Sequence, residues 1–457
     1  MNKTVSKDDV FSKLPIKRAT LMQILPSIAS QMVALIYGFA DTFFVGRLND
    51  PDQTAAVTVS TSVFLLLTAL SNLFGIGGAS VIARALGVND RSRAEKTSAF
   101  SFYAAAVGGL LFSAIVAVFR SDILMLCGAK GKVVEYAGGY VFYTVILGSI
   151  PTVLTNTMAN LVRAEGSAGT ASFGVTLGCI LNIILDPIFV LPNFLNMGAA
   201  GAGLATAISN AAGMLFFLSY VLKNRRDTVV KLSARNLKYI RETAGDVLKI
   251  GSPSALQYLL TVVGVSTQMN FVSKYGNDAV AGLGITKKLD QLPLYFSIGI
   301  ANGLLPLIGY NYAAGNHERT EKAFRFGCTI SLCFAVLCVI AYEIFARPLA
   351  GFFIDDAETV NYAASFLRRM VLAMPFMSIC YPMIVKFQAM GKAKESLIVS
   401  VLRKGVIDIP LYFITDSIVP LYGCMWVQPI VDTVSLMAAL FLNFHITKTT
   451  KQTIPEH

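Results

Sequence analysis

Apolar residues occupy most of the chain in long runs, separated by short connections that hold charged and turn-forming residues. A helix needs about 20 apolar residues to cross a bilayer. Runs of sufficient length lie at 19–46, 55–83, 97–119, 134–161, 169–191, 201–222, 247–273, 279–311, 324–347, 359–390, 396–418 and 421–446. None of them alternates apolar and polar residues as a barrel strand does, so the pattern predicts an all-α polytopic membrane protein with twelve transmembrane helices.

The runs form two similar sets of six. The sequence Arg-Ala-Glu-Lys at 93–96 recurs as Arg-Thr-Glu-Lys at 319–322, and a Tyr-Ala pair at 136–137 recurs at 362–363. Both recur at the same separation along the chain, which we call the repeat offset. Internal repeats of this kind build two lobes with a solute site between them, near the bilayer midplane. The sequence therefore predicts a transporter with an N-lobe at 1–225, a cytoplasmic linker at 226–250 and a C-lobe at 251–457.

Charge is sparse and unevenly placed. The chain is 54% hydrophobic and 14% charged, with a mean hydropathy of +0.61, values that exclude an ordinary soluble domain. Lysine and arginine concentrate in the connections 84–96 and 223–249, which the positive-inside rule places in the cytoplasm together with both termini. The net charge of +11 then reflects a basic inner rim facing anionic lipid, and we expect no nucleic-acid partner.

Side chains suited to catalysis, metal binding or ATP hydrolysis are scarce. The seven cysteines lie mostly in apolar runs and the three histidines lie in a loop or near the C-terminus, so we expect no disulfide framework, metal site or catalytic triad. The Gly-Lys-Val at 131–133 lacks the rest of a phosphate-binding loop. Gly75, Gly77 and Gly78 follow no strand, which favours helix packing over a dinucleotide site. We interpret the chain as a transporter without a cofactor, not an enzyme, and active transport must draw on an ion gradient.

Two carboxylates lie deep in apolar runs of the first half, where a charge costs about 2.5–3.5 kcal/mol by insertion scales. Asp41 is in the first run, and Asp186 is in the fifth, four residues after Asn182. This spacing places Asn182 and Asp186 on one helix face. Pro187 frees a backbone carbonyl beside them, and Thr206 in the sixth run adds a hydroxyl. On this interpretation only the first half holds deep carboxylates, which points to the N-lobe as the coupling site.

Each carboxylate also has a purely structural interpretation. Asp41 could be a solvated cap at the extracellular mouth, beside Gly46, Arg47 and Asn49. Asp186 could form a salt bridge or a helix cap near the outer face. If the two carboxylates meet, the pair can bind either H⁺ or Na⁺, and the sequence does not choose between them.

Motifs in both halves resemble a known family. They are Pro26, Gln31, Asp41, Val45 and Gly46; Gly75, Arg84 and Gly87; Asn182, Asp186 and Pro187 followed by residues 201–206; and Gly303, Pro306, Gly309, Tyr310, Asn311, Tyr312 and Gly315. Together they resemble the MATE (multidrug and toxic compound extrusion) family, most closely its bacterial MepA-like branch. The resemblance implies two six-helix lobes, substrate/cation antiport by alternating access, and an N-lobe cation site formed by Asp41, Asn182, Asp186 and Thr206.

The chain departs from this family in the second half. Members that bind Na⁺ in the C-lobe carry a glutamate in the seventh helix and an aspartate in the tenth, where this chain offers Thr261 and Tyr381. The repeat offset places Thr267 at the position equivalent to Asp41 and Tyr412 at the position equivalent to Asp186. The sequence therefore argues against a cation site in the C-lobe.

Basic residues instead lie inside apolar runs of the second half. Lys287 and Lys288 accompany Asp290 in the eighth run, and Arg368 and Arg369 lie in the tenth, which has Lys386 near its inner end. Two interpretations stay open. In one, a lysine pairs with Asp290 while the arginines reach the outer headgroups and Lys386 the inner ones. In the other, these bases line a C-lobe cavity that attracts anionic or zwitterionic solutes.

The candidates for the substrate cavity combine these bases with polar, aromatic and methionine side chains that can adapt to varied solutes. They are Gln31, Tyr37, Lys287, Lys288, Asp290, Asn311, Arg368, Arg369 and Met377.

The leading hypothesis is a secondary active exporter of small organic molecules or drugs, driven by H⁺ or Na⁺. Alternatives are an exporter of an anionic or zwitterionic metabolite and a lipid-linked flippase. We expect a monomer in the bacterial inner membrane whose partners are its small-molecule substrate and the lipid bilayer.

Overall fold

The computed structural model describes residues 7–48 and 50–452, and regular structure within these ranges is helical throughout. The α-helices are α1 (Lys7–Ser12), α2 (Ile16–Gly46), α3 (Pro51–Gly87), α4 (Arg91–Val118), α5 (Arg120–Leu126), α6 (Lys132–Val141), α7 (Ser149–Ala164), α8 (Ala168–Val190), α9 (Gly198–Lys223), α10 (Ile240–Val272), α11 (Asn277–Ala313), α12 (His317–Gly351), α13 (Ala357–Met370), α14 (Met374–Ala389), α15 (Ala393–Val401), α16 (Asp408–Ile418) and α17 (Gly423–Gln452). Short π or 3-10 segments are η1 (Phe142–Leu147), η2 (Ala234–Tyr239), η3 (Ser273–Tyr275), η4 (Val371–Ala373) and η5 (Leu402–Val406). The predicted all-α fold is confirmed.

The twelve predicted crossings correspond to helices or to helix pairs. Within the described ranges nine helices are long and apolar enough to span a membrane, α13 and α14 being counted as one. A tenth span is formed by Lys132–Leu147 and Ser149–Ala164, which meet at a bend of 55°. The remaining two are α10, which is rich in Ser, Thr and Gln, and the pair α15 and α16, which are too short to cross singly.

The helix boundaries repeat as the sequence does. Helices α3 and α11 begin and end at the repeat offset from one another, and α4 and α12 begin at that offset. Between the halves, α11 packs along α2 and α10 packs along α3. Since α2 corresponds to α10 and α3 to α11, these two contacts are equivalent, as expected for two lobes related by a pseudo-two-fold axis.

Glycines let helices of the two lobes approach closely, and Gly77, for which the sequence favours a role in helix packing, is one of them. A Cβ on Gly77 would lie 2.2 Å from the Val247 carbonyl oxygen, and one on Gly251 would lie 1.8 Å from the Leu73 carbonyl oxygen. Gly299 and Gly303 on α11 fit tightly against the α2 backbone as well. We call Gly77, Gly251, Gly299 and Gly303 the glycine seam.

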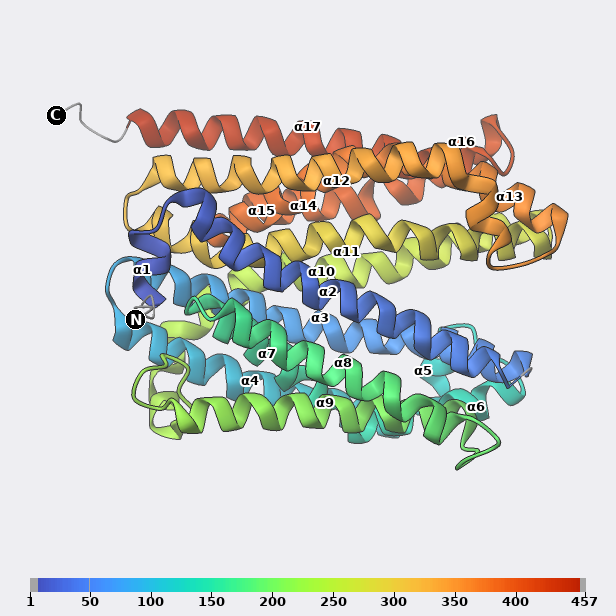
Figure 1. The fold of residues 1–457 in the computed structure, drawn as a ribbon, viewed down its shortest axis with the longest axis horizontal. Coiled ribbons are helices and arrows are strands. Elements are labelled where there is room, and N and C mark those ends of the chain that lie inside the picture. Colours follow the sequence, from blue (N-terminus) through green and yellow to red (C-terminus); the bar gives the residue numbers. More distant parts are fainter. Residues whose placement is uncertain (1–6, 49, 453–457) are drawn as a thin grey trace.

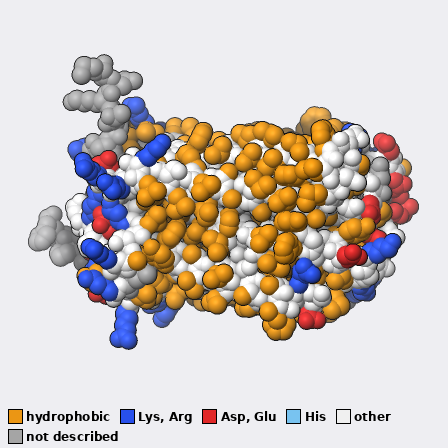
Figure 2. Space-filling view, turned by 90° about the horizontal axis from the view of Figure 1, so that it is seen from below, with side chains coloured by type: hydrophobic (Ala, Val, Ile, Leu, Met, Phe, Trp, Pro, Cys, Tyr) orange, Lys and Arg blue, Asp and Glu red, His pale blue; other side chains and the backbone are white. Residues whose placement is uncertain are grey.

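Charge separates the two ends of the bundle. Figure 2 shows a broad hydrophobic band, with lysines and arginines gathered at one end and acidic side chains at the other. The basic end carries the connections 84–96 and 223–239 and holds α1 and the end of α17 (Figure 1). We call the opposite end the far end. The seam glycines lie in the halves of α3, α10 and α11 nearer the basic end, so the lobes are closed there.

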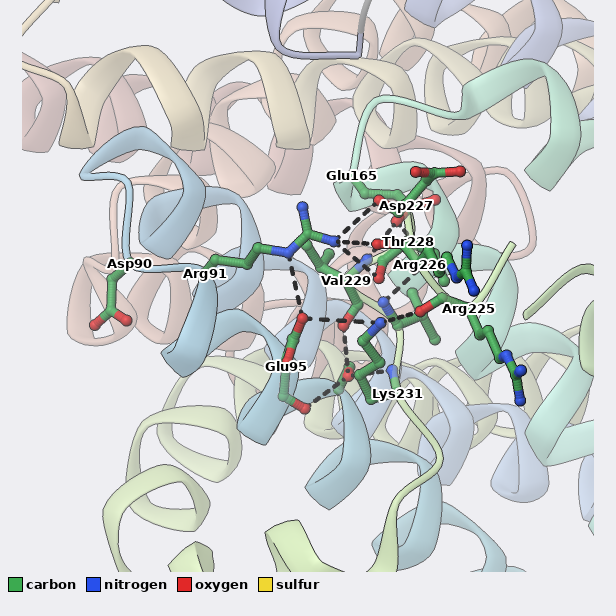
Figure 3. Close-up of polar contacts among 12 residues, drawn as sticks. Asp90, Arg91, Glu95, Glu165, Arg225, Arg226, Asp227, Thr228, Val229 and Lys231 are labelled. Carbon is green, nitrogen blue, oxygen red and sulfur yellow. Dashed lines mark hydrogen bonds and ion pairs between the residues drawn. The ribbon is translucent and has the colours of Figure 1, made fainter. Parts of the chain in front are cut away.

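The interlobe connection is bound to the basic end of the N-lobe (Figure 3). The buried Glu165 carboxylate accepts hydrogen bonds from the Thr228 hydroxyl at 2.6 Å, the Val229 amide at 3.0 Å and the Tyr220 hydroxyl at 2.9 Å. Arg91 donates to the carbonyl oxygens of residues 226 and 227 at 3.1 and 3.2 Å. Helix α10 begins at Ile240, within the linker predicted at 226–250.

Candidate functional site

The N-lobe carboxylates lie on neighbouring helices in the far-end half of the bundle. Asp41 is close to the end of α2, and Asp186 is one turn from the end of α8. Helix α8 packs against both α2 and α9, and α9 contributes Thr206. All three of these side chains are buried, Asp186 completely. The fold thus gathers into one region side chains that are far apart in the sequence.

Asn182 connects Asp186 to Thr206. Its amide nitrogen faces Asp186, because only this orientation satisfies both ends of the amide. The nitrogen then donates to the two carboxylate oxygens at 3.2 and 2.8 Å, and the amide oxygen accepts from the Thr206 hydroxyl at 3.1 Å and from its backbone N–H at 3.0 Å. The Tyr37 hydroxyl lies 3.4 Å from the Thr206 hydroxyl and extends the chain of polar contacts. Four of the predicted residues therefore meet in one hydrogen-bonded group.

Asp41 stands beside this group rather than inside it. Its Oδ1 atom is buried and has no hydrogen-bond partner among the described residues. The carboxylate interacts electrostatically with Asp186 and with Lys288 on α11 of the C-lobe. An unsatisfied buried oxygen is costly, and oxygen atoms from carboxylate, amide and hydroxyl groups are hard ligands suited to protons or small cations. We call Asp41, Asn182, Asp186 and Thr206 the N-lobe site.

The prediction that deep carboxylates occur only in the first half is wrong. Asp408 and Asp432 are buried in the C-lobe, and Asp432 accepts from Arg403 Nε at 2.7 Å and from Gln428 Nε2 at 2.8 Å. Asp408 accepts from the backbone amides of Gly405 at 2.5 Å and Ile409 at 2.9 Å. With Lys404, whose Nζ donates to Gln428 Oε1 at 2.9 Å, these residues form what we call the C-lobe charge network.

The repeat itself could have revealed this network. Asp408 stands at the repeat offset from Asn182, and Asp432 stands at the same offset from Thr206. From the two N-lobe carboxylates the offset leads only to Thr267 and Tyr412, whereas from the neutral Asn182 and Thr206 it leads to the two C-lobe acids. Arg403 is also buried, and its guanidinium lies over the Tyr381 ring, 4.2 Å from the centroid. Its ion pair with Asp432 balances the two buried charges.

The other cavity candidates are spread over the molecule. Lys287 has Asp290 and Asp408 as acidic neighbours, and Met377 is buried in α14. Arg368 and Arg369 lie in the last turn of α13, a helix that lies at the far end of the bundle (Figure 1). Gln31 is partly exposed on α2.

Asn311 and Lys386 make contacts within the fold that differ from the roles expected for them, a cavity residue and a lysine that reaches the inner headgroups. Asn311 was a cavity candidate, but its amide donates to the carbonyl oxygens of Phe11 and Leu307 and accepts from Arg319 Nε, so its hydrogen-bonding capacity anchors α1 to the basic end of α11. Lys386 does not reach the headgroups. Its buried ammonium donates to Glu321 at 2.6 Å.

Known proteins match nearly the whole chain. The sequence profile of the MatE family matches residues 26–188 and 253–414, once in each lobe. The multidrug export protein MepA of Staphylococcus aureus is 31% identical over 433 residues, which cover 94% of each chain. The outward-facing structure of a multidrug resistance MATE family transporter is 26% identical with a TM-score of 0.91, over 99% of this chain and all of that one.

A further solved structure is described by the polarity of its binding pocket. It is a transporter of the MOP superfamily from Pyrococcus furiosus, described as having a binding pocket of reverse polarity. It is 25% identical, with a TM-score of 0.89 over 99% of this chain and 100% of that one.

The arrangement resembles a transport site and not a catalytic centre. Buried carboxylates, an amide and hydroxyl groups lie in a helical bundle whose two lobes repeat the same pattern. Membrane-crossing helices in two lobes, a profile that matches each lobe and a relative that aligns with 94% of the chain agree with one another. The chain belongs to the MATE family of membrane transporters.

Proposed function

We propose that this protein is a secondary active exporter of small organic molecules or drugs, which couples export to H⁺ or Na⁺ entry through the N-lobe site. The observation that carries the proposal is the buried oxygen of Asp41, which has no hydrogen-bond partner in the described part of the chain and lies beside the Asn182–Asp186–Thr206 group. The similarity to proteins named for multidrug export supports the substrate class. No cofactor is required, because the driving force is an ion gradient.

We propose that the basic end faces the cytoplasm, which places both chain ends inside and the N-lobe site in the outer half of a bacterial inner membrane. One chain supplies both lobes, and we expect it to work as a monomer. The glycine seam then closes the cytoplasmic side, so that return to the inward-open state after release of substrate requires the seam to open.

Lys288 offers a link between ion binding and lobe movement. It lies on α11 of the C-lobe and interacts electrostatically with Asp41 of the N-lobe. A cation or proton bound at Asp41 would cancel this attraction across the lobes, which changes the relative stability of the two conformations. Tyr37, Gln31 and Lys288 then line the path between the lobes, while Lys287, Asp290 and Met377 stay cavity candidates.

The proposal is tested by substrate efflux from proteoliposomes under an imposed pH gradient or an imposed Na⁺ gradient. We expect Asp41→Asn and Asp186→Asn to reduce gradient-driven efflux at least about tenfold, because the amide keeps the shape but removes the charge that attracts the cation. Asp122→Asn, at an exposed carboxylate of the far end, is the matched control. If both N-lobe variants transport as well as this control, the N-lobe site is not the coupling site.

A second candidate function is export of anionic or zwitterionic solutes, which the adjacent Lys287 and Lys288 favour. The Pyrococcus furiosus protein with a pocket of reverse polarity is a structural relative. A panel of quaternary ammonium dyes and organic acids separates the two functions. Strong export of the dyes without export of the acids would eliminate the second.

A further inference from the structure

An open pocket of about 620 Å³ lies at the far end of the C-lobe, apart from the N-lobe site and from the C-lobe charge network. Its walls come from α12, α13, η4 and the start of α17. Three arginines, Arg347, Arg368 and Arg369, line it together with Trp426 and Leu372. We call it the arginine pocket. Its charge contrasts with the acidic side chains that gather at this end of the molecule (Figure 2).

Two of the three guanidinium groups are held in place by neutral partners. Arg347 donates to Asn361 Oδ1 at 2.6 Å, and Arg369 donates to the Ser365 carbonyl oxygen at 2.8 Å and to its hydroxyl. Arg369 also stacks over the Tyr422 ring, 4.5 Å from its centroid. These contacts fix the orientation of the groups without neutralising them.

Negative charge near the pocket is insufficient to balance the arginines. Among the described residues the nearest carboxylate partner is Glu343, 3.9 Å from Arg368 Nε, beyond hydrogen-bond distance, and both side chains are about half exposed. Each guanidinium has five N–H donors, and the contacts above occupy only a few of them. The geometry favours an anion with several oxygen atoms, and arginine binds phosphate in bidentate fashion.

The position of the pocket indicates where such an anion comes from. Arg347 is about one turn from the end of α12 and Trp426 is about one turn from the start of α17, so both lie within about 6 Å of a helix end. Trp426 and Leu372 are 42% and 37% exposed. Tryptophan is typical of the membrane–water boundary, and an apolar wall beside arginines suits a ligand with both a phosphate and an acyl-glycerol part.

We propose that the arginine pocket binds the phosphate of a glycerophospholipid headgroup from the outer leaflet. On this proposal Arg368 and Arg369, which were substrate-cavity candidates, hold lipid instead of substrate. The pocket shares no residue with the N-lobe site, and its test does not depend on transport. Free phosphate is the competing source of the same chemistry, and the experiment distinguishes the two.

Trp426 is the only tryptophan in the chain, so its fluorescence reports on this pocket alone. The full-length protein in an uncharged detergent is titrated with short-chain phosphatidylglycerol, with diacylglycerol of the same chain length, with glycerol 3-phosphate and with inorganic phosphate. We expect a saturable change with phosphatidylglycerol and at least tenfold weaker responses with the other three. An equal response to diacylglycerol would exclude phosphate recognition, and an equal response to glycerol 3-phosphate or inorganic phosphate would exclude the lipid.

Arg347→Gln and Arg368→Gln test the arginines from two different helices. Each should weaken phosphatidylglycerol binding about tenfold, as expected for loss of a charge-assisted hydrogen bond. Arg47→Gln, at an exposed arginine near the end of α2 in the other lobe, should leave it unchanged. Size-exclusion chromatography verifies that each variant is folded. Unaltered binding in both folded pocket variants would overturn the proposal.

Discussion

At the scale of single residues, the two lobes treat equivalent positions differently. The N-lobe places the neutral side chains Asn182 and Thr206 beside Asp186. One buried oxygen of Asp41 has no hydrogen-bond partner within residues 7–48 and 50–452. The C-lobe places Asp408 and Asp432 at the positions equivalent to the two neutral residues and balances them internally, Asp432 by Arg403. A carboxylate paired with a guanidinium has little attraction left for an external cation. This difference supports coupling through the N-lobe site alone.

The Arg403–Asp432 pair can be tested by removing one charge or both. Both side chains are at most 2% exposed. Asp432→Asn leaves a buried arginine without its counter-charge and should destabilise the protein by about 3 kcal/mol, whereas the double variant Arg403→Met/Asp432→Leu should recover most of that loss. Thermal unfolding in detergent measures both. A double variant that is less stable than the single one would show that the pair contributes through its own attraction.

At the scale of the elements, close approach of helices depends on the glycine seam. Helix α10 packs on α3 with Gly251 against the Leu73 carbonyl oxygen and Gly77 against the Val247 carbonyl oxygen. Backbone contact at this distance leaves no room for a side chain.

A break in one helix also positions a polar group. Helices α15 and α16 are separated by the π segment η5, in which Gly405 has a φ of 108°. This break brings the Gly405 amide to Asp408.

Gly251→Ala should weaken the α3–α10 contact. The added Cβ would lie 1.8 Å from a backbone oxygen, so the helices must move apart, at a cost of about 1–3 kcal/mol for overpacking. For Gly245→Ala on the same helix, no atom of the described residues beyond its own surroundings lies within 4 Å of the new Cβ, and the higher helix propensity of alanine should leave stability equal or improved. Unfolding temperatures in detergent compare the two. Equal temperatures would mean that the seam does not limit packing.

At the scale of the whole molecule, two pseudo-symmetric lobes are closed at the basic end by the glycine seam and interact near the far end through Asp41 and Lys288. Ion pairs join α4 to α10 at the basic end, Arg93 to Asp246 at 2.5 Å and Lys96 to Glu242 at 3.3 Å. These pairs are exposed, so each contributes little. The close backbone contacts of the seam are the buried part of this closure.

Lys288→Gln should increase the affinity of the N-lobe site for the coupling cation. A positive charge near Asp41 opposes cation binding, so its removal should lower the half-saturating concentration of the coupling ion by about tenfold, which corresponds to ~1.4 kcal/mol. Lys287→Gln is the matched control, because the acidic neighbours of Lys287 are Asp290 and Asp408. Efflux is measured against the concentration of the coupling ion. Equal shifts in the two variants would rule out a specific Lys288–Asp41 link.

Much of the fold followed from local patterns along the chain. Apolar runs predicted helices and the repeat predicted two lobes, because a membrane imposes helix length and backbone pairing on every crossing segment. Charge in the connections predicted the basic end. Family motifs indicated Asp41, Asn182, Asp186 and Thr206, and the spacing of Asn182 and Asp186 on one helix face followed from helix geometry.

The sequence by itself thus determined the helices, their repeat and their membrane setting, since each depends on neighbouring residues and on the solvent around them. Only the tertiary structure decided which charges are balanced. It paired Arg403 with Asp432 and Lys386 with Glu321, set Lys288 near Asp41 and assigned Asn311 to hold α1. The physical reason is that an electrostatic partner is set by distance in space, and helices far apart in the chain become neighbours only when the lobes pack.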